Sequence, residues 1–280
     1  MTDHSSLEAL AMDVAREAGA LAARRRGEGV SIAATKSSLA DIVTDADREV
    51  EALIRERLAA ARPADGFLGE ESGHSPGVSD ITWIVDPIDG TVNYTYGIPA
   101  YAVSIAAVTG GVDPASWKAV SGAVFNPVVG EMFHASRGAG AHLDGSRIAV
   151  NAEISPAGAM VATGFGYDPA SRPATLAQLA RVMPLMRDLR RIGAASLDLA
   201  YVACGRLDGY FERGLNPWDH AAGALLVQEA GGRVGGAPHG RPGPGMTIAA
   251  IDPLFEQLHD LLGVDLESPP TAPSSHPTSS

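Results

Sequence analysis

Cysteine is almost absent from this sequence of 280 residues, which contains only Cys204. A single cysteine excludes an intramolecular disulfide and any zinc site built from several cysteines, and it fits a reducing compartment. The first residues also lack the basic segment and apolar core of a secretory signal. We therefore expect a cytoplasmic protein.

Clustered basic residues are also lacking. The chain has 21 Lys plus Arg against 33 Asp plus Glu, which gives a formal net charge of −12. Proteins that bind nucleic acid by neutralising phosphates need basic patches. We expect no direct nucleic-acid partner, and the acidic excess favours cations as ligands.

The sequence has no convincing membrane-spanning segment. The longest run without a charged residue, residues 91–112, is about long enough to cross a bilayer. It contains Asn93, Pro99 and several glycines, however, and it begins directly after a pair of carboxylates. We interpret it as a buried strand with flanking turns and expect no membrane partner.

The sequence does contain alternating helical and strand patterns. Leu7, Leu10 and Val14 recur at helical spacing, whereas short apolar runs separated by turn residues follow from Trp83 onward. This mixture predicts a layered α/β (α+β) fold. The expected helices span residues 7–25, 45–61, 175–188, 197–204, 218–230 and 253–262, and the expected strands span residues 83–85, 102–108, 119–125, 131–135, 160–163, 207–211 and 247–251.

A connector near residues 151–158 divides the chain. We predict an N-terminal α+β subdomain of residues 1–152 and a C-terminal α/β subdomain of residues 153–265. Residues 266–280 are mostly Pro, Ser and Thr with little to bury, so they are predicted to form a disordered tail. The glycine-rich residues 231–245 are predicted to form a surface loop.

The segment that carries most chemical information is Asp86-Pro87-Ile88-Asp89-Gly90-Thr91, which follows a buried strand. Pro87 fixes its φ and Gly90 permits a sharp bend, so both carboxylates can face the same side. Two such carboxylates repel each other unless a cation lies between them or one is protonated. Mg²⁺ prefers oxygen ligands of this kind together with substrate phosphate. The amides of Gly90 and Thr91 lie where a short helix begins, which is a suitable seat for a phosphate.

Each of these acidic and hydroxyl residues also has an ordinary structural interpretation. Asp86 and Asp89 are typical turn formers, and Thr91 is a common helix N-cap. Asp219 lies in the first turn of a predicted helix, where the helix dipole favours an acid without any further role. Glu70 and Asp47 would by default be solvated loop acids. Taken one at a time, these residues leave the question open.

Three separated motifs together resemble the sequence signatures of the inositol monophosphatase family. They are Gly69-Glu70-Glu71-Ser72, then residues 83–93 (WIVDPIDGTVN), then Pro217-Trp218-Asp219 followed by Glu229-Ala230-Gly231-Gly232. Their order and spacing match the family, and the likeness runs from about residue 7 to residue 262. Residues 97–101, 191–195 and 209–212 are most similar to the bacterial inositol-1-monophosphatase branch.

The resemblance implies a five-layered αβαβα sandwich and a Mg²⁺-dependent phosphatase with two to three ions per subunit. The N-terminal subdomain would hold most metal ligands, and the C-terminal one would supply Asp219 and the sugar contacts. The implied metal ligands are Glu70, Asp86, the Ile88 carbonyl, Asp89 and Asp219. Thr91, Asp47 and Glu70 match the residues that activate water. The implied substrate contacts are Asp89, Gly90, Thr91, Ala195, Glu212 and Asp219, and Lys36 matches the basic residue of a mobile loop over the metals.

The implied reaction is hydrolysis of myo-inositol monophosphate by a metal-activated water, without a covalent intermediate. Asp86 and Asp89 are three residues apart, whereas haloacid-dehalogenase phosphatases space their two aspartates by two. The resemblance also implies a lithium-sensitive homodimer. Two alternatives stay open: a histidinol-phosphate phosphatase of the same family, and a regulatory binding protein in a transcription complex.

Overall fold

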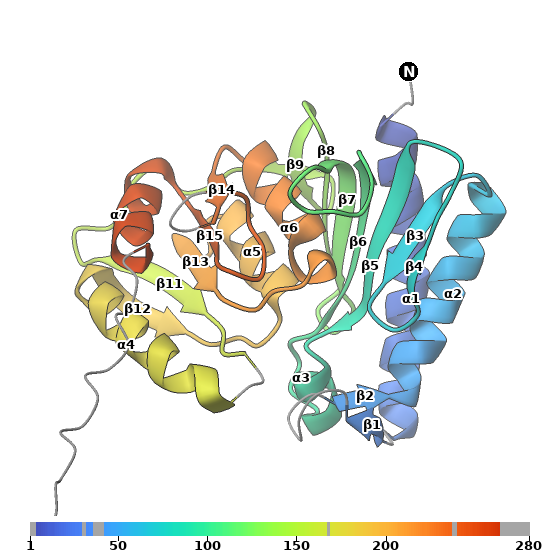
Figure 1. Cartoon of the computed structure of the whole chain (residues 1–280), viewed down its shortest axis with the longest axis horizontal. Coiled ribbons are helices and arrows are strands. Elements are labelled where there is room, and N and C mark those ends of the chain that lie inside the picture. Colours follow the sequence, from blue (N-terminus) through green and yellow to red (C-terminus); the bar gives the residue numbers. More distant parts are fainter. Residues whose placement is uncertain (1–3, 30–31, 36–41, 167–168, 237–239, 264–280) are drawn as a thin grey trace, which may run out of the picture.

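A computed structural model describes residues 4–29, 32–35, 42–166, 169–236 and 240–263. Lys36 and the predicted disordered tail lie outside the described residues. The elements stack as helices, sheet, helices, sheet and helices (Figure 1). The predicted five-layered αβαβα sandwich is therefore confirmed. Among the described residues, no helix has the length and apolar character needed to cross a membrane.

The first two layers are a pair of helices and an eight-stranded sheet. Helices α1 (His4–Glu28) and α2 (Asp45–Ala61) cover one face of that sheet. Strands β3 and β5 run parallel, and the other neighbours run antiparallel. In spatial order the strands are β10 (Ser146–Ile148), β9 (Gly140–Leu143), β8 (Glu131–Ser136), β7 (Lys118–Asn126), β6 (Ala102–Thr109), β5 (Ile81–Asp89), β3 (Gly66–Gly69) and β4 (Gly73–Ser75).

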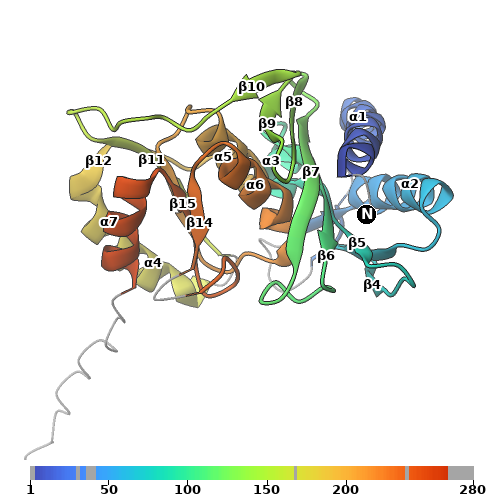
Figure 2. The same ribbon diagram turned by 90° about the horizontal axis from the view of Figure 1, so that it is seen from above.

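The remaining layers come from the second half of the chain. Helices α5 (Ala195–Ala203) and α6 (Pro217–Glu229) lie between the two sheets, and α4 (Arg172–Val182) and α7 (Asp252–Leu262) lie on the outer face (Figure 2). The second sheet has the order β12 (Met186–Arg190), β11 (Ala159–Thr163), β13 (Gly209–Glu212), β15 (Thr247–Ala250) and β14 (Arg233–Gly235). Smaller elements are the ribbon β1 (Ile32–Thr35) and β2 (Ile42–Thr44), helix α3 (Thr91–Tyr96), and 3₁₀ turns at Pro169–Ser171 and Met183–Leu185.

Strand β6 shows how the first sheet joins two cores. Side chains alternate between the faces of a strand, and Val103 and Ile105 pack into the core under α1 and α2. Ala102 and Ala106 pack into the central core beside α5 and α6. Because helices cover both faces, the strand reads as a continuous apolar run rather than an alternating one.

The chain passes from the first sheet to the second between β10 and β11, that is, between Ile148 and Ala159. This crossing coincides with the predicted connector. The central core nevertheless takes residues from both halves, such as Phe133 and Leu225. The division into subdomains at residue 152 stays a prediction.

The predicted helix over residues 175–188 is wrong in its second half. Helix α4 ends at Val182, and Met186–Arg190 instead form β12, which pairs in parallel with β11. Pro184 explains the break, because proline lacks the N–H that a helix interior needs and clashes with the preceding turn. The predicted loop over residues 231–245 also contains the short strand β14. Strands β3, β4, β9 and β10 were likewise not predicted, because runs of three or four residues carry little periodicity.

Candidate active site

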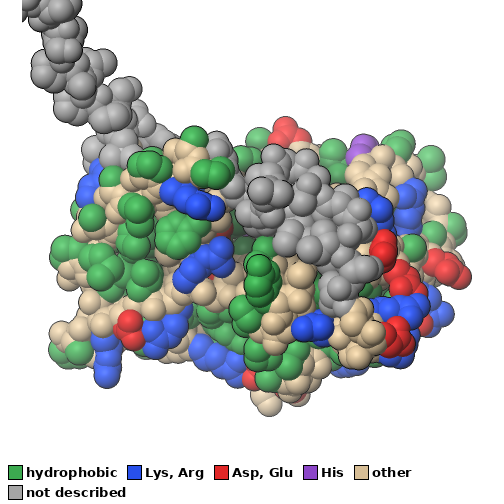
Figure 3. All heavy atoms as spheres, turned by 90° about the horizontal axis from the view of Figure 1, so that it is seen from below, with side chains coloured by type: hydrophobic (Ala, Val, Ile, Leu, Met, Phe, Trp, Pro, Cys, Tyr) green, Lys and Arg blue, Asp and Glu red, His purple; other side chains and the backbone are tan. Residues whose placement is uncertain are grey.

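A cavity of about 760 Å³ opens where β5, the N-termini of α5 and α6, and β13 meet. Arg191 and Arg213 also line the cavity. Figure 3 shows the molecule from below the view of Figure 1, and on that face the Lys and Arg side chains lie in several small groups. The predicted site residues that line the cavity are Glu70, Asp86, Ile88, Asp89, Gly90, Thr91, Ala195, Glu212 and Asp219.

A β-bulge at the end of β5 brings the two central carboxylates to one face. Asp86 is paired with Ser104 on β6, and Asp89 is paired with Ala102, so three steps on β5 match two on β6. In a regular strand, residues three apart point to opposite faces. The extra residue of the bulge reverses that alternation. Both Asp86 and Asp89 therefore line the cavity, and the bulge is what places them on one face.

Gly90 makes the turn from β5 into α3. Its φ is 91°, and a Cβ there would lie 3.0 Å from the carbonyl oxygen of Ala100, so a larger residue would be strained as well as crowded. The next residue, Thr91, starts α3 with its Oγ1 3.2 Å from Asp47 Oδ1 and 3.1 Å from the carbonyl oxygen of Ile88. Asp47 is almost fully buried at the start of α2. The predicted pairing of Thr91 with Asp47 is thus present in the structure.

Asp89 is held by the N-terminus of α5. The backbone N–H of Ala195 donates to Oδ1 at 3.2 Å, and the N–H and hydroxyl of Ser196 donate to Oδ2 at 2.7 and 2.5 Å. Donors at a helix N-terminus favour the ionised form of a carboxylate. They lower the pKa of Asp89, although burial raises it by more. Ala195 therefore orients Asp89 through its backbone N–H.

Asp219 serves as a helix cap as well as a cavity residue. It follows Pro217 in the first turn of α6, and its Oδ2 accepts the backbone N–H of Asn216 at 2.6 Å. This capping bond uses one oxygen of the carboxylate. The structural and chemical interpretations of Asp219 are therefore compatible.

Glu212 enters the cavity from the end of β13. The hydroxyl of Tyr210 donates to its Oε2 at 2.6 Å, and burial raises the pKa of Glu212 to about 7. The adjacent cavity residue is Gly164, where a Cβ would overlap the Glu212 carboxylate. Glycine at that position leaves room for a polar acceptor inside the cavity.

The buried carboxylates repel one another. Burial, together with the charges of Glu70 and Asp89, raises the pKa of both Asp86 and Asp219 well above the usual value. Such a cluster is stable in its ionised form only with a compensating cation. The lining residues include four carboxylates, Glu70, Asp86, Asp89 and Asp219, and carboxylate oxygens are hard ligands of the kind that Mg²⁺ prefers. The residues present therefore fit a Mg²⁺ centre.

Several residues that shape the site were not predicted from the sequence. Ser196 donates two hydrogen bonds to Asp89, and Tyr210 orients Glu212. Asp198, almost fully buried on α5, has its pKa raised by burial and by the charges of Glu212 and Asp89. A serine at the start of a helix is an ordinary capping residue. Nothing in the local sequence therefore marks Ser196 as a partner of Asp89, which lies 107 residues earlier.

Replacing Ser196 with Ala is expected to raise the Mg²⁺ concentration needed for half-maximal activity by about tenfold. The change removes a hydroxyl that orients Asp89, and losing such an outer contact typically costs 10–100-fold in metal affinity or activity. Ser121→Ala is the matched control, because Ser121 is also fully buried but bonds to the carbonyl of His4 instead. If both variants need the same Mg²⁺ concentration for half-maximal activity, Ser196 does not support metal binding.

Comparison with known proteins agrees with this geometry. A family model described as the inositol monophosphatase family matches residues 3–263. Inositol-1-monophosphatase SuhB of Mycobacterium tuberculosis is 43% identical over 262 residues, covering 90% of this chain and 88% of that protein. A protein of Xylella fastidiosa named Nus factor SuhB is 44% identical over 223 residues, covering 79% of this chain and 78% of its own.

A solved structure supports the same assignment. The extragenic suppressor protein suhB of Bartonella henselae superimposes with a TM-score of 0.85 at 38% identity, covering 92% of this chain and 98% of that one. The family match spans nearly the whole chain, and it includes Glu70, Asp86, Asp89 and Asp219, which line the cavity. The chain therefore belongs to the inositol monophosphatase family, a family of metal-dependent phosphatases.

Proposed function

We propose that this protein is a Mg²⁺-dependent phosphomonoesterase that hydrolyses myo-inositol monophosphate to myo-inositol and inorganic phosphate. The observation that carries the proposal is one cavity that combines three features. It has a buried cluster of carboxylates, a hydroxyl paired with a buried acid, and a polar acceptor at Glu212 for a polyol. We further propose that two to three ions bind per subunit.

The ions would be held by Glu70, Asp86, the Ile88 carbonyl, Asp89 and Asp219. When bound, Mg²⁺ neutralises this charge, admits the anionic ester and makes water more acidic. The repulsion already seen among these side chains supports the assignment, because the ester brings further negative charge into the same space.

Thr91 and Asp47 would remove a proton from the attacking water. The single proton of the Thr91 hydroxyl can be donated to Asp47, which leaves an oxygen lone pair to accept a proton from water. The water oxygen then bonds to phosphorus, the ester P–O bond breaks, and the inositol oxygen takes a proton from a second water molecule, while Asp47 keeps the proton of the attacking water until it is returned to solvent. The backbone amides of Gly90 and Thr91, at the start of α3, would contact the phosphate.

Glu212 would select a polyol as the leaving group. Its Oε2 already accepts the Tyr210 hydroxyl, and carboxylate oxygens have capacity for further donors. Sugar hydroxyls would supply those donors, together with contacts to Asp89, Ala195 and Asp219. Burial raises the pKa of Glu212 to about 7, and Arg191 opposes that rise, which favours the ionised acceptor.

Two other functions deserve direct comparison. Histidinol phosphate would use the same metal cluster, and only the contacts around Glu212 would change. A regulatory role in a transcription complex is suggested by the name of the Xylella fastidiosa relative. The carboxylate cluster favours catalysis as the primary function, since a purely structural role gives no reason to bury mutually repelling acids.

The test is phosphate release from myo-inositol 1-phosphate and L-histidinol phosphate, measured side by side with Mg²⁺ and with EDTA. We expect strong Mg²⁺-dependent preference for the inositol ester. Preference for histidinol phosphate would support the same metal-dependent hydrolysis, with histidinol phosphate as the substrate instead of the inositol ester. Inactivity on both esters, combined with co-purification of RNA polymerase, would favour the regulatory role.

Replacing Thr91 with Val is expected to lower kcat by roughly 10²–10⁴-fold, the usual contribution of a positioned acid or base. Valine keeps the shape of threonine but cannot pass a proton between water and Asp47. Thr91→Ser is the matched control, because it retains the hydroxyl and should keep most of the activity. Equal rates for the valine and serine variants would show that the hydroxyl takes no part.

The location, oligomeric state, inhibition and partners of the enzyme are further proposals. We propose a cytoplasmic homodimer whose activity is inhibited by lithium and which acts on a small phosphorylated polyol without direct contact to nucleic acid or membrane. Sedimentation of the purified chain tests the dimer, and the rate at increasing Li⁺ with Mg²⁺ held constant tests the inhibition.

A further inference from the structure

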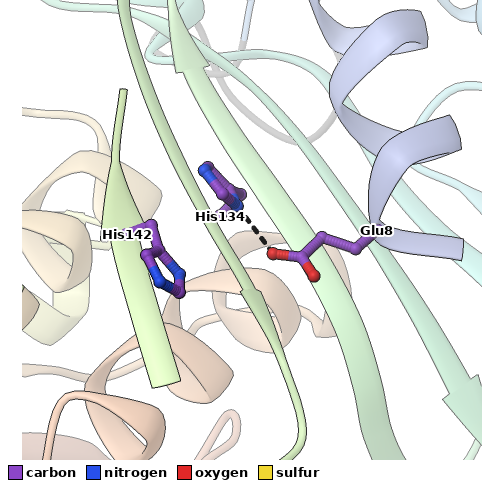
Figure 4. Close-up of side chains that lie close together, drawn as sticks. All are labelled: Glu8, His134 and His142. Carbon is purple, nitrogen blue, oxygen red and sulfur yellow. Dashed lines mark hydrogen bonds and ion pairs between the residues drawn. The ribbon is translucent and has the colours of Figure 1, made fainter. Parts of the chain in front are cut away.

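A second group of potential metal ligands lies outside the cavity. Glu8 projects from α1, and His134 and His142 project from the neighbouring strands β8 and β9 (Figure 4). The two histidines are directly opposite each other in the antiparallel pair. None of the three lines the carboxylate cavity, and no motif discussed above includes them.

These three side chains bring their ligand atoms close together. One nitrogen of each ring and one Glu8 oxygen all lie within 4.8 Å of one another. His134 Nδ1 is 2.6 Å from Glu8 Oε1, and the two imidazole rings are stacked with centroids 5.2 Å apart at an interplanar angle of 16°. The side chains would have to turn for the three atoms to surround one cation, because the stacked rings direct their nitrogens along nearly parallel planes.

Both imidazole rings carry a buried nitrogen without a partner. Within the part of the chain that the structure describes, His134 Nε2 and His142 Nδ1 form no hydrogen bond. His134 is 9% exposed, so its ring is largely removed from water. Leaving buried polar atoms unpaired is unfavourable, and such atoms need an explanation. An ion bound through His142 Nδ1 would give that nitrogen a partner, whereas His134 faces Glu8 through Nδ1 and its Nε2 lies on the other side of the ring.

Glu8 is already oriented as a ligand. Ser136 donates its hydroxyl to Glu8 Oε2 at 2.5 Å, while Oε1 faces His134. A hydrogen bond to a metal-binding side chain, such as the one from Ser136 to Glu8, holds that side chain in place and increases its affinity for the metal.

The ligand types distinguish this cluster from the cavity. Two imidazoles and one carboxylate suit Zn²⁺ and related transition metals, with water in a fourth position. Mg²⁺ prefers sites made of oxygen, which is the set found in the cavity. The two groups should therefore bind different ions.

We propose that Glu8, His134 and His142 form a second metal site, specific for a transition-metal cation such as Zn²⁺, that ties the start of α1 to strands β8 and β9. The site is structural, because it joins α1 to β8 and β9 near the edge of the first sheet and none of its three residues lines the cavity. It goes beyond the proposed phosphatase function and does not depend on it.

The test is calorimetric titration of Zn²⁺ into the full-length chain, stripped with a chelator and then held in excess Mg²⁺ so that the cavity is occupied. We expect one equivalent of Zn²⁺ to bind. His142→Gln and Glu8→Gln should each weaken that binding by at least tenfold, since loss of even an outer contact costs 10–100-fold. His74→Gln, at an exposed histidine on β4, is the matched control and should bind Zn²⁺ like the parent.

Two further measurements locate the ion. Asp219→Asn should keep the Zn²⁺ equivalent, because that change affects only the cavity. Zn²⁺ should raise the melting temperature of the parent and of His74→Gln but not of His142→Gln. Melting of His142→Gln as cooperatively as the parent in Mg²⁺ alone establishes that it folds.

The proposal is overturned if the parent binds no Zn²⁺ in excess Mg²⁺, which would leave a simple Glu8–His134 ion pair. It is equally overturned if the parent and His142→Gln bind Zn²⁺ alike, or if Asp219→Asn alone abolishes binding. Phosphate release in Mg²⁺ should be the same in His142→Gln and the parent. A failure of the phosphatase proposal is therefore distinguishable from a failure of this one.

Discussion

Asp219→Asn is expected to lower Mg²⁺-dependent phosphate release by roughly 10²–10⁴-fold, the range seen when a positioned charge or catalytic group is lost. The fold should persist, because an asparagine carbonyl oxygen can still accept the Asn216 N–H that Asp219 Oδ2 accepts at 2.6 Å. The change thus removes a charge from the cavity and leaves the helix cap in place. Steady-state phosphate release, with circular dichroism to confirm folding, measures both effects.

Asp252→Asn is the matched control for this prediction. Asp252 also lies in the first turn of a helix, α7, but it faces Arg233 on the surface and not the cavity. The control should keep near-parental turnover. Near-normal turnover of Asp219→Asn itself would contradict the assignment of Asp219 to the metal centre.

Mg²⁺ is expected to stabilise the chelator-treated protein against heat by roughly 5–10 °C. An ion that binds only the folded chain adds about 2.7 kcal/mol at a concentration 100 times its Kd. For chains of this order of length, 1 kcal/mol shifts the melting temperature by about 2–4 °C. Repulsion among the buried carboxylates is the reason for the large effect, because the ion neutralises charges that otherwise oppose folding.

The same repulsion predicts how this stabilisation depends on pH. The pKa of Asp86 and of Asp219 is raised in the folded chain, so the folded state holds those protons more tightly than the unfolded state. Their favourable contribution in metal-free protein is complete below the ordinary carboxyl pKa of about 4 and is lost as pH rises through the raised values. Mg²⁺ should therefore stabilise more at pH 8 than at pH 5.5.

Asp219→Asn provides the control for the stability prediction. With one acid removed, the metal-free variant should lose less stability than the parent as pH rises, and Mg²⁺ should stabilise it less. Differential scanning calorimetry of both proteins, with Mg²⁺ and with EDTA, makes the comparison. Equal Mg²⁺ shifts at the two pH values would contradict the carboxylate cluster as the binding site.

Much of the site could be predicted because its chemistry lies in short local motifs. Asp86, Asp89 and Thr91 are close in sequence, in a turn whose proline and glycine allow the carboxylates to face one side. The backbone feature that places the two aspartates on one face could not be predicted from these motifs. A bulge between β5 and β6 places both aspartates on one face, and its register depends on pairing with a strand further along the chain.

What could not be predicted depends on contacts between distant segments. Ser196 meets Asp89 only after α5 packs against the end of β5. Glu8 and His134 likewise lie more than a hundred residues apart and meet where α1 covers β8. In the second sheet, Met186–Arg190 become a strand because β11 offers a parallel edge, which outweighs the helical pattern of the preceding residues.

The most direct test of the central claim is anomalous diffraction from crystals of the protein grown with Mn²⁺ in place of Mg²⁺, together with inorganic phosphate. We predict Mn²⁺ peaks in the cavity between Glu70, Asp86, Asp89 and Asp219, with phosphate beside Gly90 and Thr91. A cavity without Mn²⁺ at saturating concentration, or phosphate bound elsewhere, would contradict the account.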